Sequence, residues 1–205
     1  MADTAATASR EQERILIGRA QSGDAPALRE LVDGHKDRLF GFIFRIVRHH
    51  DDAEEICQEA FLKAFASLDS FRSEYRFSTW LFTIAYRVSL NHLRRKRPLT
   101  GDLDFNALPQ EAFDAPTSTL ESQDASRLKD MIWSSVNQLT PPQRASVVLF
   151  YRYEVNCQEI ARVLELPVAT VKSHLHRARN RLREMLEQVS EKDLRHFRNR
   201  STAAG

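Results

Sequence analysis

Apolar residues recur at helical spacing through most of the chain, and turn-flanked alternating strands are absent. The pattern predicts N-terminal helices over about 11–21, 24–46, 51–67 and 77–97. It predicts C-terminal helices from near Leu120 or Ser126 to about 139, and over about 141–150, 158–164 and 168–186. Residues 1–9 are small and polar, which is typical of a frayed tail. The fold class is therefore all-α.

Cap residues support several of these boundaries. Asp24 can cap the second helix, with Pro26 in its first turn. One of the aspartates at 51 and 52 can cap the third. The run Thr140-Pro141-Pro142-Gln143 has the spacing of a capping box.

Residues 98–126 separate two helical domains. This stretch contains no Lys or Arg, and its acidic residues are Asp102, Asp104, Glu111, Asp114, Glu121 and Asp124. A segment this long without helical pattern is unusual inside one compact domain, so it is interpreted as an acidic, flexible linker. The predicted organisation is an N-terminal domain at 1–97, a linker at 98–126 and a C-terminal domain at 127–205.

Composition excludes several classes of protein. The 205 residues carry a net charge of +2, too little to argue for nucleic-acid binding without a local cluster. Cys57 and Cys157 are far apart and have no second ligand at zinc spacing, which suits a reducing cytoplasm. No signal peptide or membrane span is expected. No catalytic group, metal or cofactor is predicted; acids at 51, 52, 54 and 55 point in different directions along a helix.

The stretch 71–97 combines aromatic and basic residues. It begins with Phe71, Arg72, Tyr75, Arg76 and Phe77 and ends with Arg94, Arg95, Lys96 and Arg97. Rings stack on unpaired bases and cations neutralise phosphates, so the stretch suits a single nucleic-acid strand. Trp80, Ile84 and Val88 lie at helical spacing, which equally favours a core position for that stripe.

Residues 158–186 have the pattern of a helix-turn-helix. A short helix with Ile160, Ala161 and Leu164 is followed by a turn at Glu165-Leu166-Pro167, where the common Gly is absent. The next helix places apolar residues inward (Val168, Val171, Leu175, Ala178, Leu182, Leu186). Its outer side carries Lys172, Ser173, His176, Arg177, Arg179, Arg181 and Arg183. This is the pattern of a recognition helix for the DNA major groove, although a merely basic amphipathic helix would share it.

Two further positions concern packing and partners. His35 lies on the apolar stripe of the second helix and is interpreted as an interface histidine. The third helix has an outer face of Glu54, Glu55, Gln58, Glu59, Leu62 and Lys63, which is either a solvated face or a docking surface for a basic partner.

Jointly these motifs resemble bacterial RNA polymerase sigma factors of the extracytoplasmic-function class. The matching segments are DDAEEICQEAFLKAF at 51–65, FRSEYRFSTWLFTIAYRVSLNHLRRKR at 71–97 and LTPPQRASVVLFYRYEVNCQEIARVLELPVATVKSHLHRARNRL at 139–182. The resemblance implies a transcription initiation factor that is not an enzyme. Its implied partners are core polymerase, promoter DNA and an anti-sigma factor.

The resemblance also implies roles for individual residues. Core polymerase would dock on Glu55, Gln58, Glu59, Leu62 and Lys63. The −10 element would contact Phe71, Arg72, Tyr75, Arg76, Phe77, Arg87, Asn91, Arg94, Arg95, Lys96 and Arg97. The −35 element would contact Lys172, Ser173, His174, His176, Arg177, Arg179 and Arg181. Arg87 stands where several relatives carry Asn, and His176 where others often carry an aromatic residue.

Two other functions fit parts of the sequence. An autonomous helix-turn-helix regulator would bind an operator unaided, usually as a symmetric dimer, but gives the aromatic-basic stretch no purpose. A recombinase or nuclease would need a nucleophile or clustered carboxylates, which the sequence does not supply convincingly.

Overall fold

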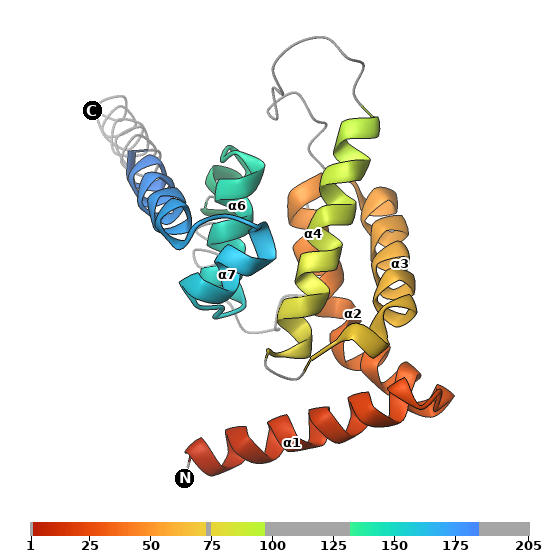
Figure 1. Ribbon diagram of the computed structural model, residues 1–205. Coiled ribbons are helices and arrows are strands. Elements are labelled where there is room, and N and C mark those ends of the chain that lie inside the picture. The colour runs from red at the N-terminus through yellow and green to blue at the C-terminus, as the bar shows by residue number, and fades with distance from the viewer. Residues whose placement is uncertain (1, 73–74, 97–131, 185–205) are drawn as a thin grey trace, which may run out of the picture.

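The computed structural model describes residues 2–72, 75–96 and 132–184, and the regular structure in these ranges is entirely helical (Figure 1). The all-α prediction is confirmed. The N-terminal half contains α1 (Ala2–Gln21), α2 (Ala25–Val47), α3 (His50–Ala66), the 3-10 turn η1 (Leu68–Ser70) and α4 (Phe77–Arg95). The C-terminal half contains a helix at 132–137, α6 (Pro141–Val147), the π-helical turn η2 (Val148–Arg152), α7 (Cys157–Leu164) and a helix at 168–184. None of the helices within the described ranges is long and apolar enough to span a membrane.

The first helix is longer than the sequence pattern predicts. It begins at Ala2, so the prediction of a frayed tail over residues 1–9 is wrong from residue 2 onward. The segment is rich in alanine, which has the highest helix propensity. Gly23 has a φ of 84°, which a residue with a side chain rarely adopts, and it makes the turn into α2. The Asp24 carboxylate accepts a hydrogen bond from the Ala27 N–H at 3.4 Å, which confirms the predicted cap.

The start of α3 differs from the prediction. His49, and not an aspartate, is the cap: its Nδ1 accepts a hydrogen bond from the Asp52 N–H at 3.4 Å. The Asp52 side chain is buried and accepts two bonds from Lys96 Nζ, at 2.5 and 2.7 Å. A carboxylate taken out of water needs such a partner. Asp52 therefore joins the beginning of α3 to the end of α4.

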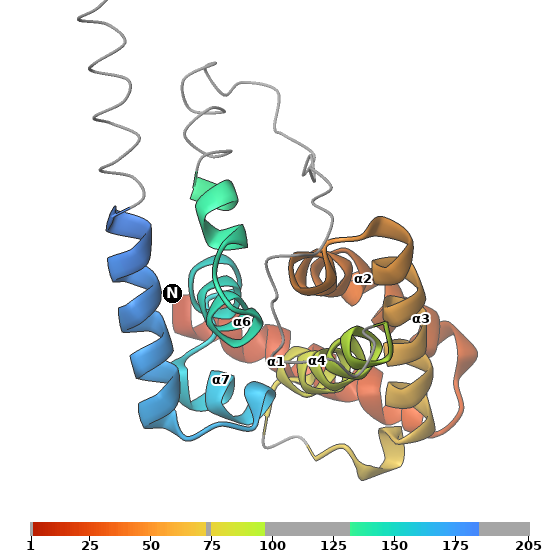
Figure 2. The same cartoon turned by 90° about the horizontal axis from the view of Figure 1, so that it is seen from above.

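Helices α2, α3 and α4 pack side by side around one core (Figure 2). Phe42 of α2 is fully buried, with its ring centroid 4.9 Å from that of Phe82 of α4. The face of α3 opposite the predicted outer face packs into the core: Ala53, Ile56, Ala60, Phe61 and Ala64 are buried, as is Leu68 just after the helix, and Cys57 is half-buried. His35 is the predicted interface histidine, since its ring packs 5.1 Å from that of Phe77 and its Nε2 lies 3.7 Å from Glu13 of α1.

The C-terminal half forms the predicted helix-turn-helix. The Thr140 N–H donates to Gln143 Oε1 at 3.3 Å, which confirms the capping box before α6. Asn156 caps α7, because its Oδ1 accepts from the N–H groups of Gln158 and Glu159 at 3.0 and 2.9 Å. Glu165 ends α7 with a φ of 57°, and so takes the left-handed position usually held by Gly. In the second helix Val171, Leu175 and Ala178 are buried and Val168 and Leu182 half-buried; Leu186 lies outside the described residues.

The two halves pack directly on each other, which the sequence did not predict. Helix α7 contacts α4, and α6 contacts α2. Tyr153, just after η2, packs beside the Phe42–Phe82 pair, at centroid distances of 6.5 Å from Phe42 and 5.2 Å from Phe82. Its hydroxyl donates to the Arg38 carbonyl of α2 at 2.8 Å. The predicted linker at 98–126 lies outside the described residues, and the exact domain boundaries stay a prediction.

Candidate nucleic-acid interface

The aromatic residues at the start of α4 form a small cluster. Phe77 is fully buried, and Phe71 is 8% exposed. Their ring centroids are 5.7 Å apart, and the Trp80 ring lies 5.2 Å from Phe71 and 5.7 Å from Phe77. The prediction that Phe71 and Phe77 stack on bases is therefore corrected for this conformation, because both rings serve the core. Trp80 is half-buried and shares the packing role.

Three predicted residues of this segment do reach the surface. Arg72, Tyr75 and Arg76 are exposed. The Tyr75 ring is not free, however, because the guanidinium carbon of Arg162 from α7 lies 4.0 Å from its centroid. A cation over a ring is attracted by the negative face of the π-system. Arg162 thus covers one face of the Tyr75 ring, and Tyr75 as a whole stays 41% exposed.

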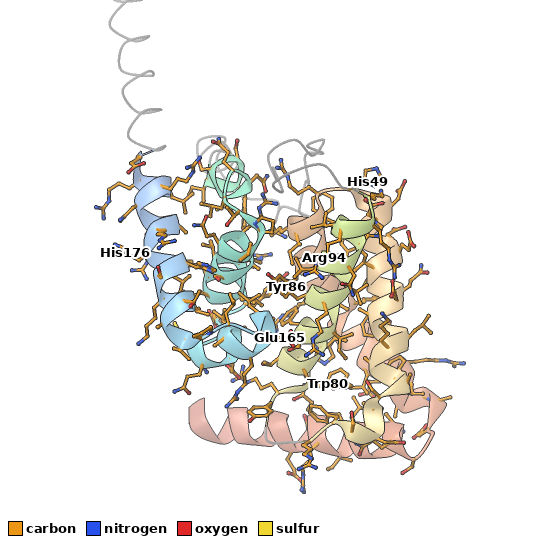
Figure 3. The ribbon with its side chains drawn as sticks, turned by 45° about the horizontal axis from the view of Figure 1, so that its top comes forward. His49, Trp80, Tyr86, Arg94, Glu165 and His176 are labelled. Atoms are coloured by element: carbon orange, nitrogen blue, oxygen red, sulfur yellow. The ribbon has the colours of Figure 1, made fainter. Side chains whose placement is uncertain are left out.

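Helix α4 has a cationic outer surface. Its sequence contains no Asp or Glu, and the predicted contacts Arg87, Asn91, Arg94 and Arg95 are all exposed (Figure 3 labels Arg94). Arg87 forms an ion pair with Glu165. Lys96 is bound by Asp52, so its predicted DNA contact competes with a buried carboxylate. Arg97 lies outside the described residues.

The second cationic surface is the helix at 168–184. Five predicted contacts are exposed: Lys172, His176, Arg177, Arg179 and Arg181. Ser173 and His174 are half-buried, so Ser173 points outward less than predicted. Burial and the nearby charge of Arg177 lower the pKa of His174, and its buried Nδ1 has no hydrogen-bond partner in the part of the chain that the structure describes. His176 lies on the side of this helix that faces away from α4 (Figure 3).

The predicted docking face lies on α3. Glu55, Gln58, Leu62 and Lys63 are exposed, and Glu59 is half-buried with its carboxylate 2.7 Å from Lys63 Nζ. Leu62 is 70% exposed, more than any other large hydrophobic residue in the described ranges. Helix α3 lies on the opposite side of α4 from α7 in both views (Figures 1 and 2). The packing of the two halves therefore leaves this face uncovered.

Buried arginines at the contact between the halves were missed by the sequence analysis. Arg144 of α6 is 1% exposed and donates to three carbonyls, those of Arg45 (3.2 Å), Asn137 (2.6 Å) and Leu139 (2.9 Å). Burial and the charge of Arg48 lower the pKa of Arg144 to about 10. Arg48 is 3% exposed, and its Nε and Nη2 have no hydrogen-bond partner within the described ranges. No sequence signal separates these arginines from ordinary surface ones, because their burial depends on the contact between the halves.

Comparison with known proteins matches both halves to the parts of one family. Residues 31–98 match the model of sigma-70 region 2, and residues 129–182 match that of sigma-70 region 4. The ECF RNA polymerase sigma factor SigW of Bacillus subtilis is 31% identical over 182 residues, which cover 84% of this chain and 96% of the relative. The chain belongs to the extracytoplasmic-function sigma factors. The RNA polymerase sigma-H factor of Pseudomonas aeruginosa is 34% identical to this sigma factor over 189 residues, covering 88% of this chain and 97% of the relative.

Solved structures show the same arrangement of helices. CnrH, solved in complex with the cytosolic domain of CnrY, has a TM-score of 0.62 and 26% identity, covering 86% of this sigma factor and 97% of that chain. The sigma factor RpoE of Bartonella quintana, solved in complex with the anti-sigma factor NepR, has a TM-score of 0.64 and 24% identity. That alignment covers 78% of this sigma factor and 96% of that chain, and it supports the fold alone.

Proposed function

We propose that this sigma factor binds core RNA polymerase, directs it to particular promoters and helps to hold the −10 element melted. The observation that carries the proposal is the presence on one chain of two separate cationic helical surfaces, on α4 and on 168–184, beside the uncovered face of α3. A regulator that contacts one duplex site needs only the second of these surfaces.

The −10 element would bind along α4 and the segment before it. Arg72, Arg76, Arg94 and Arg95 are exposed and would neutralise phosphates of the single strand. Tyr75 would stack on a base. Flipping a base out of a duplex costs a few kcal/mol, which stacking at ~1–3 kcal/mol per base together with phosphate contacts would offset. Arg87 and Asn91 lie further along the same helix, where they would contact the strand beyond that base.

The −35 element would bind to the helix at 168–184. Lys172, Arg177, Arg179 and Arg181 supply positive charge, and His176 supplies hydrogen-bonding nitrogen atoms. Arginine recognises guanine through two parallel hydrogen bonds in the major groove, whereas a phosphate contact carries no sequence information. Ser173 and His174 are less accessible and would contact the duplex only at close approach.

Core polymerase would dock on α3. The exposed acids and Gln58 offer polar contacts, while Leu62 offers exposed apolar surface on the same face. The reaction itself belongs to the polymerase, so this chain is proposed to act in the cytoplasm without catalysing a step. An inhibitory protein partner is also proposed, since CnrH, which is 26% identical to this sigma factor, was solved in complex with a protein partner, the cytosolic domain of CnrY. A tagged chain should then co-purify from its own cells with a protein that blocks its activity in transcription.

Run-off transcription with purified core polymerase, followed by sequencing of the transcript starts, tests the proposal. Starts should share two upstream sequence elements, and the double variant Gln58→Ala, Glu59→Lys should lose most of the transcript while its circular dichroism is retained. Glu59 pairs with Lys63 at the surface, and such a pair contributes only ~0.2–1 kcal/mol to folding. Transcription that is insensitive to this change, or operator binding without polymerase, would favour an autonomous regulator instead.

A further inference from the structure

A cavity of about 370 Å³ lies between α1 and the segment that leads into α4. Figure 1 shows α1 across the end of the bundle at which α4 begins. One face of α1 lines one side of the cavity, and its lining residues are Arg14, Ile15, Ile17, Gly18, Gln21 and Phe71. The volume lies within the range of small-ligand pockets. None of the described residues of the C-terminal half lines this α1 cavity, so the contact between the halves leaves it open.

Gly18 keeps the α1 side of the cavity open. Glycine in the interior of a helix costs stability relative to alanine, and Gly18 lies one turn before the end of α1. Packing does not require a glycine here, because a Cβ added at position 18 would meet no atom within 4 Å. A larger side chain would instead extend into the cavity. The missing side chain therefore preserves the space and does not serve the fold.

The walls of the α1 cavity are mainly apolar. Ile17 and Phe71 are 5% and 8% exposed and lie at its bottom, whereas Ile15 is 56% exposed at its opening. The Phe71 ring packs against Phe77 and Trp80, and Figure 3 shows Trp80 at the end of α4 nearest α1. Phe71 therefore offers a ligand only a small part of its ring. A ligand in the cavity would also remove apolar surface of Ile15 from water, which is favourable.

Two polar side chains border the cavity, about two turns apart on α1. Arg14 Nε and Nη2 donate to Glu11 at 3.1 and 2.7 Å, which orients the guanidinium and leaves Nη1 without a partner among the described residues. Gln21 Nε2 donates to the Leu68 carbonyl at 3.0 Å, and Gln21 Oε1 accepts from no residue in the described ranges. A donor and an acceptor thus remain for a ligand. A nucleobase has a flat face and an edge of donors and acceptors, so its chemistry matches this cavity.

The α1 cavity adjoins the segment proposed to bind the −10 strand. Arg72 directly follows Phe71 and is exposed, as are Tyr75 and Arg76. A strand whose phosphate is neutralised by Arg72 has a base on either side of that phosphate, next to the cavity. We propose that the α1 cavity binds one unpaired base of the strand that α4 holds. This proposal rests on the proposed function of α4, and it adds α1, where no contact was predicted, to the strand-binding surface.

An apolar side chain of a protein partner is the alternative ligand. It would contact Ile15 and Phe71 and would use neither the Arg14 donor nor the Gln21 acceptor, whereas a base edge uses both. Continuity of the cavity with Arg72 also favours a nucleic-acid strand. The two ligands differ in what a blocked cavity changes, because a base contributes to strand binding and a protein side chain contributes to polymerase binding.

Gly18→Leu blocks the cavity and keeps all its other lining residues. Leucine has a higher helix propensity than glycine, and no atom obstructs its Cβ, so the variant should fold. Gly34 is the matched control position, since it is exposed on α2 and a Cβ added there also meets no atom within 4 Å. Circular dichroism and Tm verify that Gly18→Leu and Gly34→Leu are folded.

The binding experiment uses the full chain without polymerase and two fluorescent DNA strands of about 12 nucleotides, within the range of known single-strand sites. One strand has a random sequence, and the other has the same phosphates without bases. Anisotropy at fixed salt gives each Kd. We expect Gly18→Leu to bind the random strand about fivefold more weakly than wild type and the abasic strand equally well. Fivefold is about 1 kcal/mol, the lower limit for stacking of one base, since Phe71 offers only a small part of its ring. Gly34→Leu should bind both strands as wild type does.

A crosslink locates the base directly and does not depend on a variant. A strand that contains photoreactive 4-thiothymidine is bound to wild type and irradiated, and the protein is digested with trypsin. Trypsin cuts after Arg14 and Arg19 and after Lys63 and Arg72, so the two sides of the cavity are released as the peptides 15–19 and 64–72. We expect the strand to be attached to both peptides, and Gly18→Leu to lose the attachment at 15–19.

Three results would overturn the proposal: a folded Gly18→Leu chain with wild-type affinity for the random strand, equal affinities of wild type for the random and the abasic strand, or no crosslink at 15–19. Loss of affinity for core polymerase in Gly18→Leu, with strand binding unchanged, would assign the cavity to a protein partner. The proposed function is tested separately, because run-off transcription includes polymerase and these measurements do not. Failure of run-off transcription with wild type, together with the expected strand binding and crosslink, would contradict the proposed function only.

Discussion

The exposed Leu62 makes the docking proposal quantitative. Its side chain is 70% exposed on α3, so about a third of its surface is already buried by folding. Complete burial of a leucine is worth about 1.5–3 kcal/mol. If core polymerase covers the exposed remainder of this side chain, its burial contributes about 1–2 kcal/mol to the free energy of binding. This contribution lowers the Kd for polymerase by a factor of roughly 5 to 30.

The test is Leu62→Gln, because glutamine has a helix propensity close to that of leucine. The free energy of unfolding should fall by at most about 1 kcal/mol, which corresponds to a shift in Tm of roughly 2–4 °C for a chain of this size. The Kd for purified core polymerase, measured by fluorescence of a labelled sigma factor, should rise by the factor given above. The single-strand affinity of the free chain should not change.

Ile15 supplies the matched control, since it is 56% exposed on α1 and lies outside the docking face. Ile15→Gln removes a similar exposed apolar side chain and should leave the Kd for polymerase unchanged. Equal Kd values for folded Leu62→Gln and wild type would show that polymerase does not bury this residue. Equal losses in both variants would show a general effect of lost surface hydrophobicity.

Three other predictions concern single residues. If Arg177 contacts a base edge, Arg177→Ala should weaken binding to the −35 element by about 1–3 kcal/mol and reduce the sequence preference at one base pair. Affinities are measured on single-base-pair variants of that element, and an equal loss of affinity for all of them would indicate a phosphate contact. Burial and the nearby charge of Arg38 lower the pKa of His35. As pH falls below about 6.5, the unfolded chain therefore binds a proton at this residue that the folded chain does not, and the protein loses stability. His35→Gln should make Tm depend less on pH between pH 7.5 and 5.5, and an unchanged dependence of Tm on pH would contradict this. Arg48→Met should raise Tm, because it removes two buried donors, Nε and Nη2, that lack partners among the described residues, and a buried unsatisfied donor costs about 1–3 kcal/mol; the exposed Arg29→Met is its control, and a lower Tm in Arg48→Met alone would refute the argument.

The fold was predictable where local chemistry decides it. Helical spacing of apolar residues identified the helices, and Asp24 and Thr140 identified two starts correctly. His49 was missed as a cap because Asp is the commoner cap and two aspartates follow it. The burial of Asp52 depends on Lys96, which lies far along the chain, so no local pattern could reveal it.

The sequence identified the residues of the candidate site, but it did not show which of their side chains are exposed. The motif around Phe71 and Phe77 is aromatic and basic, and composition alone cannot say which rings enter the core. Packing decides that, and it buries both phenylalanines while exposing Tyr75. The burial of Arg144 was also not predictable from the sequence, because it depends on a contact between two halves that were predicted to be joined by a flexible linker.

The contact between the halves combines apolar burial with buried positive charge. Tyr153 contributes apolar burial and one hydrogen bond, and Arg87 contributes a surface ion pair that is worth ~0–1 kcal/mol. Against these stand two buried guanidinium groups, where a buried unsatisfied donor costs about 1–3 kcal/mol. The buried guanidinium groups therefore subtract from the stability that the packing of α7 on α4 and of α6 on α2 provides.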